Sequence, residues 1–394
     1  MSQINIIDLF AGCGGLTEGF VSIKNYKTLA VVEWEKEPLD TLKNRLLNKW
    51  GYKDEELFIR YDLQDINGLQ EGLEKEGYEK TIGLRKVVNK KKVNLIIGGP
   101  PCQAYSIAGR AQDKHGMKRD YRNYLFESFV KLVDIYKPEY FVFENVPGIL
   151  SAKPGDLLVT DRIRKAFYDI GYEISDDLKN EGLFDVSYYG VPQVRKRVII
   201  FGSKKKNKTK ISNFYESLNQ KMLKEQEILR PHIEGMVKFK PVSIDKNMYT
   251  YTPIGKNSLN NNNPRKHSKR DADIFKLLAL DIETEKFKYS STAAKKELYF
   301  KRTGKKSNFH KYHVLDYDKP SNTIPAHLYK DGLCHIHPDS NQKRSITPRE
   351  AARIQSFPDD FFFTGPMTAN YKMIGNAVPP KFAKTIARTV LEVL

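Results

Sequence analysis

Cys102 is the side chain whose neighbours best suit it to act as a nucleophile. It lies in the stretch Gly98 to Ser106, which follows a short apolar run, Val93 to Ile97, that predicts a buried strand. Two glycines permit a sharp turn after that strand, and two prolines stiffen the segment that carries the thiol. Taken alone, a free cysteine at a strand end is more often buried and inert. Ligands of open α/β sheets, however, bind at the carboxyl ends of the strands, where this turn presents the thiol.

Charged side chains near two later strands could assist such a nucleophile. Glu144 follows the aromatic run Tyr140 to Phe143, so it is a candidate acid at the same edge of the sheet as the cysteine. Strand alternation before the next apolar run predicts that Gln193, Arg195 and Arg197 share one face. On one face, these side chains could converge on an anionic or carbonyl-rich ligand.

The N-terminal residues predict a strand, a glycine loop and a helix. The apolar run Ile4 to Asp8 precedes Phe10-Ala11-Gly12-Cys13-Gly14-Gly15, and helical spacing follows from Leu16 to Ile23. Glycines at such a junction let a ligand approach the backbone closely. The loop does not have the spacing of the dinucleotide fingerprint, so a plain turn is an equally good interpretation of this segment alone.

Acids also end the next two predicted strands. The runs Thr28 to Val32 and Leu57 to Tyr61 end at Glu33-Trp34 and at Asp62. An acid after the second strand can accept hydrogen bonds from ribose hydroxyls, and the indole of Trp34 could stack on adenine. Because no lysine or arginine accompanies the glycine loop, we expect an adenosine that carries no phosphate.

The elements that position these groups alternate between strand and helix, which predicts a parallel α/β sheet. Helical periodicity is found from Lys36 to Asn48, from Leu125 to Tyr136 and in the C-terminal stretch from Phe382 to Leu394. Thr347, followed by Pro348 and by Glu350 three residues on, predicts a further helix with a capping box.

The positive charge is concentrated in one region. The 394 residues carry a formal net charge of +18, and Phe201 to Tyr312 holds 26 Lys and Arg against 11 Asp and Glu. Aromatic residues are interleaved with these charges, which favours a folded basic module that meets a polyanion over a disordered tail.

Composition also argues against several classes of protein. No apolar stretch is long enough to span a membrane and the N-terminus does not resemble a signal peptide, so we expect a cytoplasmic, nucleoid-associated protein with no membrane partner. Three widely spaced cysteines argue against a disulfide framework. The spacing of His310, His313, Cys334, His335 and His337 fits no zinc pattern, and we expect no metal.

Six motifs occur in the order and approximate spacing of the C5-cytosine DNA methyltransferases, and the chain resembles that family over all but its basic middle region. The motifs are Phe10-Ala11-Gly12-Cys13-Gly14-Gly15, Pro101-Cys102-Gln103, Glu144-Asn145-Val146, Gln193-Val194-Arg195-Lys196-Arg197, Arg349-Glu350-Ala351-Ala352-Arg353 with Gln355-Ser356-Phe357-Pro358-Asp359, and Gly375-Asn376-Ala377-Val378-Pro379-Pro380. The resemblance implies a Rossmann-like S-adenosylmethionine-dependent methyltransferase domain of the α/β class, with a smaller, basic target recognition domain.

The resemblance implies three domain segments. Residues 1–202 would form the first part of the catalytic and cofactor-binding domain, and 203–320 the target recognition domain. Residues 321–394 would return to the catalytic domain, with the C-terminal helix completing the cofactor pocket. No base code can be read from the recognition segment.

The resemblance also implies which residues bind the methyl donor, S-adenosylmethionine, which becomes S-adenosylhomocysteine. Glu33 would bind the ribose, Trp34 would lie against the adenine, and Asp62 would accept a hydrogen bond from the adenine amino group. The full set of expected donor-binding residues is Phe10, Gly12, Gly14, Gly15, Glu33, Trp34, Asp62, Leu63, Pro101, Leu125, Asn376 and Ala377.

Cys102 would be the nucleophile, and Glu144 would bind N3 and the exocyclic amine of cytosine. Arg197 would contact the base carbonyl, while Arg195 supports the acid. The expected substrate-binding residues are Pro100, Gln103, Ser106, Arg122 and Gln193.

The resemblance therefore implies a monomeric, sequence-specific methyltransferase acting on double-stranded DNA, paired in function with a restriction endonuclease. A tRNA methyltransferase of the same family is an alternative, although that branch lacks a large recognition module. A catalytically silent DNA-binding regulator on this fold is another alternative, which would be expected to lack Cys102 or Glu144.

Overall fold

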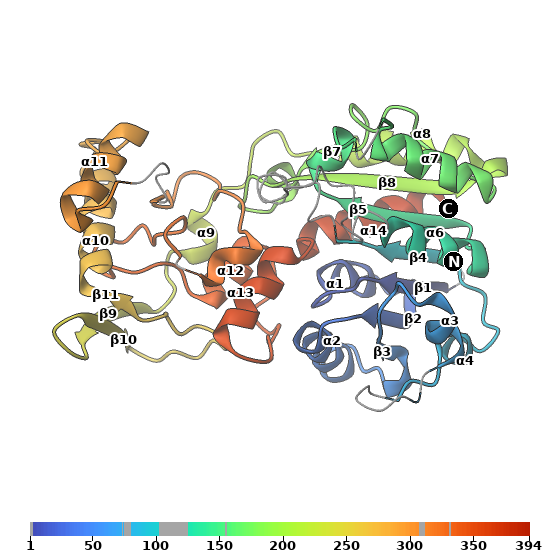
Figure 1. Cartoon of the computed structure of the whole chain (residues 1–394), viewed down its shortest axis with the longest axis horizontal. Coiled ribbons are helices and arrows are strands. Elements are labelled where there is room, and N and C mark those ends of the chain that lie inside the picture. Colours follow the sequence, from blue (N-terminus) through green and yellow to red (C-terminus); the bar gives the residue numbers. More distant parts are fainter. Residues whose placement is uncertain are drawn as a thin grey trace. The chain divides into compact units, whose positions relative to one another are not determined.

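The chain forms two compact units. A computed structural model describes residues 3–72, 74, 80–101, 125–153, 156–306, 312–330 and 332–394. Unit 1 comprises Met1–Tyr189, Arg195–Lys224 and Ala377–Leu394, and unit 2 comprises Gly190–Val194 and Glu225–Asn376 (Figure 1).

A predominantly parallel sheet of eight described strands forms the centre of unit 1, in the order β3-β2-β1-β4-β5-β8-β6, with β7 paired to β8. Strands β5, β6 and β7 each pair with β8 in the antiparallel sense. The strands are β1 (Ile4–Leu9), β2 (Tyr26–Glu33), β3 (Phe58–Arg60), β4 (Leu95–Gly98), β5 (Tyr140–Asn145), β6 (Tyr172–Ile174), β7 (Leu183–Asp185) and β8 (Lys196–Lys204). The predicted α/β class is confirmed.

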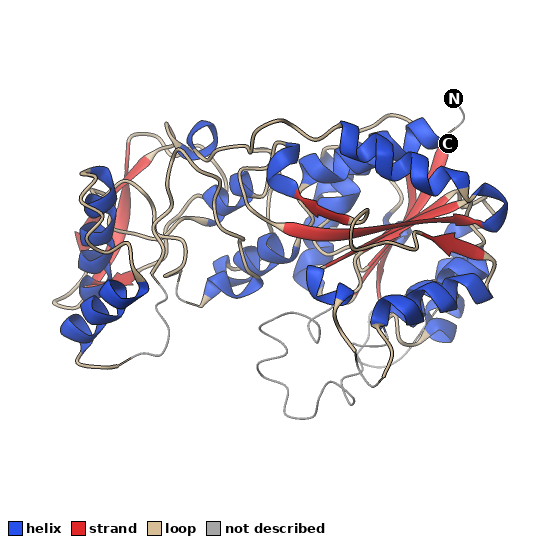
Figure 2. Cartoon of the chain, turned by 90° about the horizontal axis from the view of Figure 1, so that it is seen from above, coloured by secondary structure: helices blue, strands red, loops and turns tan. Residues whose placement is uncertain are grey.

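Helices lie on both sides of this sheet (Figure 2). They are α1 (Gly15–Val21), α2 (Lys36–Asn48), α3 (Ile66–Glu71), α4 (Leu84–Val88), α6 (Leu125–Tyr136), α7 (Val159–Asp169), α8 (Thr209–Gln220) and α14 (Pro380–Val393). Short 3-10 turns are η1 (Glu55–Leu57), η3 (Pro147–Leu150), η4 (Val186–Tyr189) and η5 (Lys205–Asn207). The helices predicted at Lys36 to Asn48 and Leu125 to Tyr136 are found with those bounds.

Aromatic packing beneath α6 and α7 holds the middle of the sheet in place. Phe129 of α6 meets Phe143 of β5 edge to face at 5.2 Å, and Phe141 stacks on Phe167 of α7 at 4.0 Å. All four side chains are buried. Burying a phenylalanine contributes roughly 1.5–3 kcal/mol, so this cluster fixes β5, the strand that carries Glu144, against its helices.

Unit 2 contains a three-stranded antiparallel sheet in the order β11-β10-β9, formed by β9 (Lys238–Ser243), β10 (Met248–Ile254) and β11 (His267–Ser268). Its helices are α9 (Arg230–Ile233), α10 (Lys269–Glu283), α11 (Thr292–Thr303), α12 (Pro348–Ile354) and α13 (Met367–Asn376), with the turn η6 (Ala326–Tyr329). Phe275 and Leu278 of α10, Leu298 of α11 and Ile336 belong to one buried apolar cluster.

The predicted capping box begins α12. The Thr347 hydroxyl accepts from the Glu350 backbone N–H, while the Glu350 carboxylate accepts from the Thr347 N–H at 2.7 Å, and Pro348 follows the cap. Glu350 also forms a fully buried two-bond ion pair with Arg344, each at 2.7 Å. This helix start therefore serves as a rigid centre of unit 2.

The unit boundaries differ from the predicted domain limits at 202/203 and 320/321. Residues 203–224 stay with unit 1 because β8 continues to Lys204 and α8 packs against β8 and α14. Residues 321–376 belong to unit 2, where η6 and α13 pack together. Among the described residues, no helix is both long and apolar enough to cross a bilayer.

Candidate active site

The carboxyl ends of the parallel strands meet at one edge of the sheet in unit 1. Leu9, the last residue of β1, pairs with Val32 of β2 and with Gly98 of β4, and Gly98 pairs in turn with Phe143 of β5. The strand order reverses between β1 and β4, and ligands bind at such a switch point. Because β8 runs antiparallel, its first residues lie at this same edge.

Glu144 and Arg197 form a close ion pair at this edge. The Arg197 Nε lies 2.7 Å from Glu144 Oε1, and each side chain is only 12% exposed. Burial lowers the pKa of Arg197, and the facing carboxylate opposes that shift. Removing either partner would leave the other as a largely buried, unpaired charge, so the pair holds the carboxylate in one orientation.

Arg195 is held differently from Arg197. It is 1% exposed, and its Nη2 donates to the carbonyl of Ala377 at 3.0 Å. Burial, together with the neighbouring Arg197, lowers its pKa, while Glu144 acts in the opposite direction. Arg195 therefore places positive charge behind the acid and ties β8 to the residue that precedes α14.

The turn after β4 fits closely against Glu144. A Cβ added at Gly99 would lie 2.9 Å from Glu144 Oε2, and one added at Gly98 would lie 2.3 Å from the Leu9 carbonyl. Asn145 Nδ2 donates to the Pro100 carbonyl at 3.3 Å. Gly99 thus allows the turn to approach the acid, and Gly98 allows β4 to lie close to β1. Asn145, which sequence reasoning did not single out as a site residue, orients the Pro100 carbonyl.

The turn leads to residues outside the described part of the chain. Cys102, Gln103, Ser106 and Arg122, all predicted site residues, lie there. Their neighbours are described: Pro101 is exposed, and Leu125 is buried at the start of α6.

The glycine loop has left-handed backbone geometry and is held by hydrogen bonding to Glu33. Phe10, Gly12 and Gly14 all have positive φ, at 56°, 56° and 90°. The Glu33 carboxylate accepts from the N–H groups of Gly12 and Glu35, each at 2.8 Å. Burial raises the pKa of Glu33, and these two backbone donors oppose the rise.

Close packing on one side of the loop contrasts with open space on the other. A Cβ at Gly15 would lie 2.2 Å from the Val378 carbonyl, and one at Gly14 would lie 2.4 Å from Leu42. At Gly12, by contrast, an added Cβ would meet nothing within 4 Å. The loop therefore leaves its Gly12 side open to a ligand while its other side packs onto α2 and the residues before α14.

The residues expected to bind adenosine differ in exposure. Trp34 is 52% exposed beside Glu33, as a stacking surface requires. The Asp62 carboxylate is half-buried and accepts from the Gln64 N–H at 3.0 Å, whereas Leu63 is buried. An exposed indole, an oriented carboxylate and an open glycine loop fit an adenosine-bearing donor.

Two further residues of this region are buried within the fold. Asp8 is fully buried in β1, where it accepts a hydrogen bond from the Thr17 hydroxyl of α1. Burial raises its pKa to about 7, opposed by the Thr17 bond and reinforced by Glu33. Cys13 is also buried, and burial raises the pKa of its thiol to about 12, which argues against Cys13 as a nucleophile.

The predicted common face of Gln193, Arg195 and Arg197 is wrong, because β8 begins only at Lys196. Gln193 belongs to unit 2 and is fully buried there. Its amide donates to Gln355 Oε1 at 3.0 Å and accepts from the Ile324 N–H at 2.8 Å.

Asn376 also belongs to unit 2, whereas Ala377 belongs to unit 1. Asn376 is the last residue of α13 and is exposed. The boundary between the two units therefore falls inside this motif.

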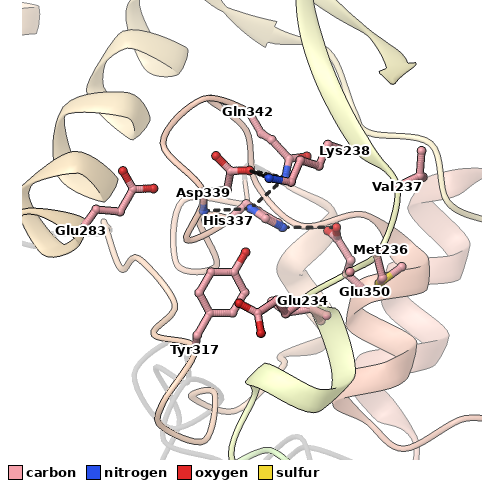
Figure 3. Close-up of a pocket in the computed structure, with 12 residues that line it drawn as sticks. Glu234, Met236, Val237, Lys238, Glu283, Tyr317, His337, Asp339, Gln342 and Glu350 are labelled. Atoms are coloured by element: carbon pink, nitrogen blue, oxygen red, sulfur yellow. Dashed lines mark hydrogen bonds and ion pairs between the residues drawn. The ribbon is translucent and has the colours of Figure 1, made fainter. Parts of the chain in front are cut away.

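Unit 2 holds a cavity of about 250 Å³ whose lining includes Tyr317, His337, Asp339 and Glu350. His337 lies among polar groups (Figure 3): its Nδ1 accepts from the Asp339 N–H at 3.1 Å, and its Nε2 is 3.5 Å from Glu350. Burial, with Arg344 nearby, lowers the pKa of His337 to about 3. The described residues contain no group of three or more His, Cys, Asp or Glu suited to a metal ion.

Known proteins resemble the chain over nearly its whole length. A family model described as C-5 cytosine-specific DNA methylase matches residues 4–392. The type II methyltransferase M.Bpa9945I of Bacillus paralicheniformis is 34% identical over 452 aligned positions, covering 99% of each chain. M.DdeI of Desulfomicrobium norvegicum, also a type II methyltransferase, is 30% identical over 98% of this chain and 88% of its own.

The solved structures agree at the level of the fold. The Entamoeba histolytica methyltransferase EhMeth has a TM-score of 0.60 at 14% identity, covering 100% of this chain and 99% of its own. At that identity the likeness concerns the fold alone.

Proposed function

The chain belongs to the C-5 cytosine-specific DNA methylase family, and from this premise we propose that it methylates C5 of a cytosine flipped out of duplex DNA. The observation that carries the proposal is the edge built by Glu144, Arg197 and the Asn145-held Pro100 carbonyl. Cys102 follows that carbonyl by two residues. The arrangement supplies an oriented acid and a hydrogen-bond acceptor next to the segment that carries the thiol.

The reaction needs a nucleophile and an acid because C5 of cytosine is poorly nucleophilic. The Cys102 thiolate adds to C6, and Glu144 stabilises the resulting enamine by hydrogen bonding or protonation at N3. When bound, S-adenosylmethionine supplies the electrophilic methyl group that C5 attacks, and it departs as S-adenosylhomocysteine. Loss of the C5 proton to a base then expels the thiolate and restores the aromatic ring.

Residues around Glu144 orient it for that task. Arg197 holds one carboxylate oxygen at 2.7 Å, which leaves the other oxygen, beside Gly99, to face the base. Arg197 thus supports the acid in addition to the base carbonyl contact expected from the resemblance. The Pro100 carbonyl has a second lone pair beyond the one used by Asn145, and an exocyclic amine could donate to it.

The donor would be held by the residues around the glycine loop. Glu33 would accept from ribose hydroxyls, Trp34 and Phe10 would contact the adenine ring, and Asp62 would accept from its amino group. The open side of the loop at Gly12 supports this placement.

The shielding of cytosine in stacked DNA and the positive charge of the protein both bear on how duplex DNA would bind. A stacked duplex shields C6, so the base must be flipped, which costs a few kcal/mol and is a step common to enzymes that act on bases. Most of the excess positive charge lies between Phe201 and Tyr312, and phosphate contacts there would offset that cost. We infer that unit 2 is the target recognition domain and that unit 1 carries catalysis.

Relatives named type II methyltransferases support a role beside a restriction endonuclease. We propose a monomer that modifies the DNA of its host at the nucleoid. A restriction partner would cleave only DNA that had not first been treated with this enzyme.

The proposal is tested with labelled S-adenosylmethionine and either duplex DNA or tRNA, followed by bisulfite sequencing of the DNA. We expect label in duplex DNA, at cytosines within one sequence context. Label in tRNA alone would instead establish the RNA-modifying alternative. DNA binding without any transfer would favour a silent regulator.

A substitution tests the nucleophile. Cys102→Ala should abolish transfer and keep DNA binding, and wild-type protein should form a covalent complex with DNA containing 5-fluorocytosine, whose C5 fluorine cannot leave. Methylation by Cys102→Ala would refute the assignment.

A further inference from the structure

The β9–β10 ribbon of unit 2 has one packed face and one exposed face. On the packed face, Phe239 is 1% exposed and lies 5.1 Å from the Arg344 guanidinium. Tyr251 follows on the same face and donates its hydroxyl to the Lys343 carbonyl at 2.8 Å. These contacts anchor the ribbon to the rigid segment that precedes α12.

Alternation places a different set of side chains on the opposite face. The antiparallel register pairs Lys240 with Thr252, Val242 with Thr250, and Lys238 with Ile254. Directly opposed residues share a face, so these six side chains form one surface, which we call the outer ribbon face. Five of the six are exposed and Thr250 is half-buried.

The charge of this face is positive and mostly uncompensated. Lys238 is 3.5 Å from Asp339, but Lys240 has no carboxylate within 4 Å among the residues that the structure describes. Lys246 and Lys256 flank the ribbon at its two ends. At the hairpin turn, the Asp245 carboxylate accepts from the N–H groups of Asn247 and Met248, so it is engaged in forming the turn.

We propose that the outer ribbon face enters the major groove of duplex DNA and determines which sequence is methylated, with Lys240 and Thr252 reading bases. This inference rests on the proposed function. A two-stranded ribbon fits a groove about 12 Å wide. Six paired positions at about 3.4 Å each extend along roughly five base pairs.

The side-chain chemistry of the face matches base edges. A lysine donates to guanine O6 and N7, a threonine hydroxyl can donate or accept, and apolar groups contact the thymine methyl. Val242 and Ile254 are 38% and 59% exposed, and they provide apolar groups next to the donors. Because packing fixes the opposite face, these side chains are presented from a rigid element.

Lysines elsewhere in unit 2 provide the comparison. Lys276 lies exposed on α10, outside the ribbon. A lysine that contacts only phosphates weakens binding similarly for all sequences, whereas a base-reading residue changes the preference at one position. Lys276→Ala therefore serves as a control that removes the same charge.

The experiment compares wild type with Lys240→Ala, Thr252→Val and Lys276→Ala by sequencing methylated cytosines in a plasmid library. We expect Lys240→Ala and Thr252→Val each to relax discrimination at one base position by about 5- to 150-fold. Lys276→Ala should keep the wild-type sequence profile. Thr252→Val preserves side-chain shape and strand preference, so misfolding would not explain its effect.

Binding selection from random duplexes provides a second measurement that needs no catalysis. If wild type transfers no methyl group, the proposed function fails, while selection still tests the ribbon. An unchanged sequence preference in both Lys240→Ala and Thr252→Val, by either measurement, would overturn the inference. That result would also be expected if the face bound another protein.

Discussion

Replacing Asp8 with asparagine should remove a loss of stability that unit 1 otherwise suffers as the pH rises from about 4 to about 7. Asp8 is fully buried, and its Oδ2 accepts from the Thr17 hydroxyl. Its Oδ1 has no hydrogen-bond partner among the described residues. Burial raises its pKa from 3.8 to about 7. Asparagine has nearly the same shape and can still accept from Thr17, but it cannot ionise.

The sign and size of the effect follow from linkage. The folded state keeps the Asp8 proton that the unfolded chain releases above about pH 4, so this group lowers stability as pH rises from about 4 to about 7. Below that window the penalty is absent, and above it the penalty is complete. Between about pH 5.5 and about pH 8, the free energy of unfolding of Asp8→Asn should gain about 2 kcal/mol relative to wild type.

Urea unfolding followed by tryptophan fluorescence measures this difference. Both tryptophans, Trp34 and Trp50, belong to unit 1, so the signal reports that unit. Asp134→Asn is the matched control because Asp134 lies on α6 with its side chain 46% exposed, in an ion pair with Lys137. Its difference from wild type should stay nearly constant with pH. If the Asp8→Asn difference is equally constant, the burial argument for this carboxyl is refuted.

Three further substitutions test contacts described above. Gly99→Ala would place a Cβ 2.9 Å from Glu144 Oε2, and by displacing the acid it should lower the single-turnover methyl-transfer rate about 100-fold while donor and DNA affinities persist. Arg344→Met leaves the buried Glu350 carboxylate without its arginine partner, so thermal unfolding should show a loss of about 3–5 kcal/mol. Glu33→Gln should weaken S-adenosylmethionine binding about tenfold by calorimetry, because the proposed hydrogen bond from ribose would lose its charged acceptor. An unchanged rate, unfolding midpoint or affinity, respectively, would contradict each expectation.

Local patterns predicted the sheet edge well. The apolar runs before Gly98, Glu33 and Glu144 are strands, and their order places the three segments at one edge. Helix α2 and the capping box at Thr347 also appear as predicted. These features depend on periodicity and on side-chain chemistry within a few residues, which is the information that a single sequence holds.

Features fixed by distant contacts could not be predicted in the same way. The start of β8 depends on its pairing with β7, where Lys196 lies opposite Asp185, and no local pattern indicates that register. The ion pair of Arg197 with Glu144 joins two residues 53 positions apart in the sequence. Strand alternation alone cannot predict that Arg197, and not Arg195, is the partner of the acid. The sequence places Asp8 at the end of a predicted strand, and no local pattern indicates that it is buried with its carboxylate accepting from the Thr17 hydroxyl of α1.

The motifs Gln193 to Arg197 and Gly375 to Pro380 are each divided between the two units, and each half forms hydrogen bonds within its own unit. In unit 1, Arg195 binds the Ala377 carbonyl at 3.0 Å. In unit 2, Gln193 binds Gln355, whose amide donates to the Ile374 carbonyl at 2.7 Å.

The chain passes between the units at 189/190, 194/195, 224/225 and 376/377, and two of these crossings, 194/195 and 376/377, have such hydrogen bonds close by. Glu144 and Arg197 both lie in unit 1, and their ion pair is not among these bonds. If β9–β10 reads bases as proposed, substitutions at Lys240 or Thr252 should change the sequence preference and keep the Glu144–Arg197 pair, because neither residue takes part in the bonds near these crossings.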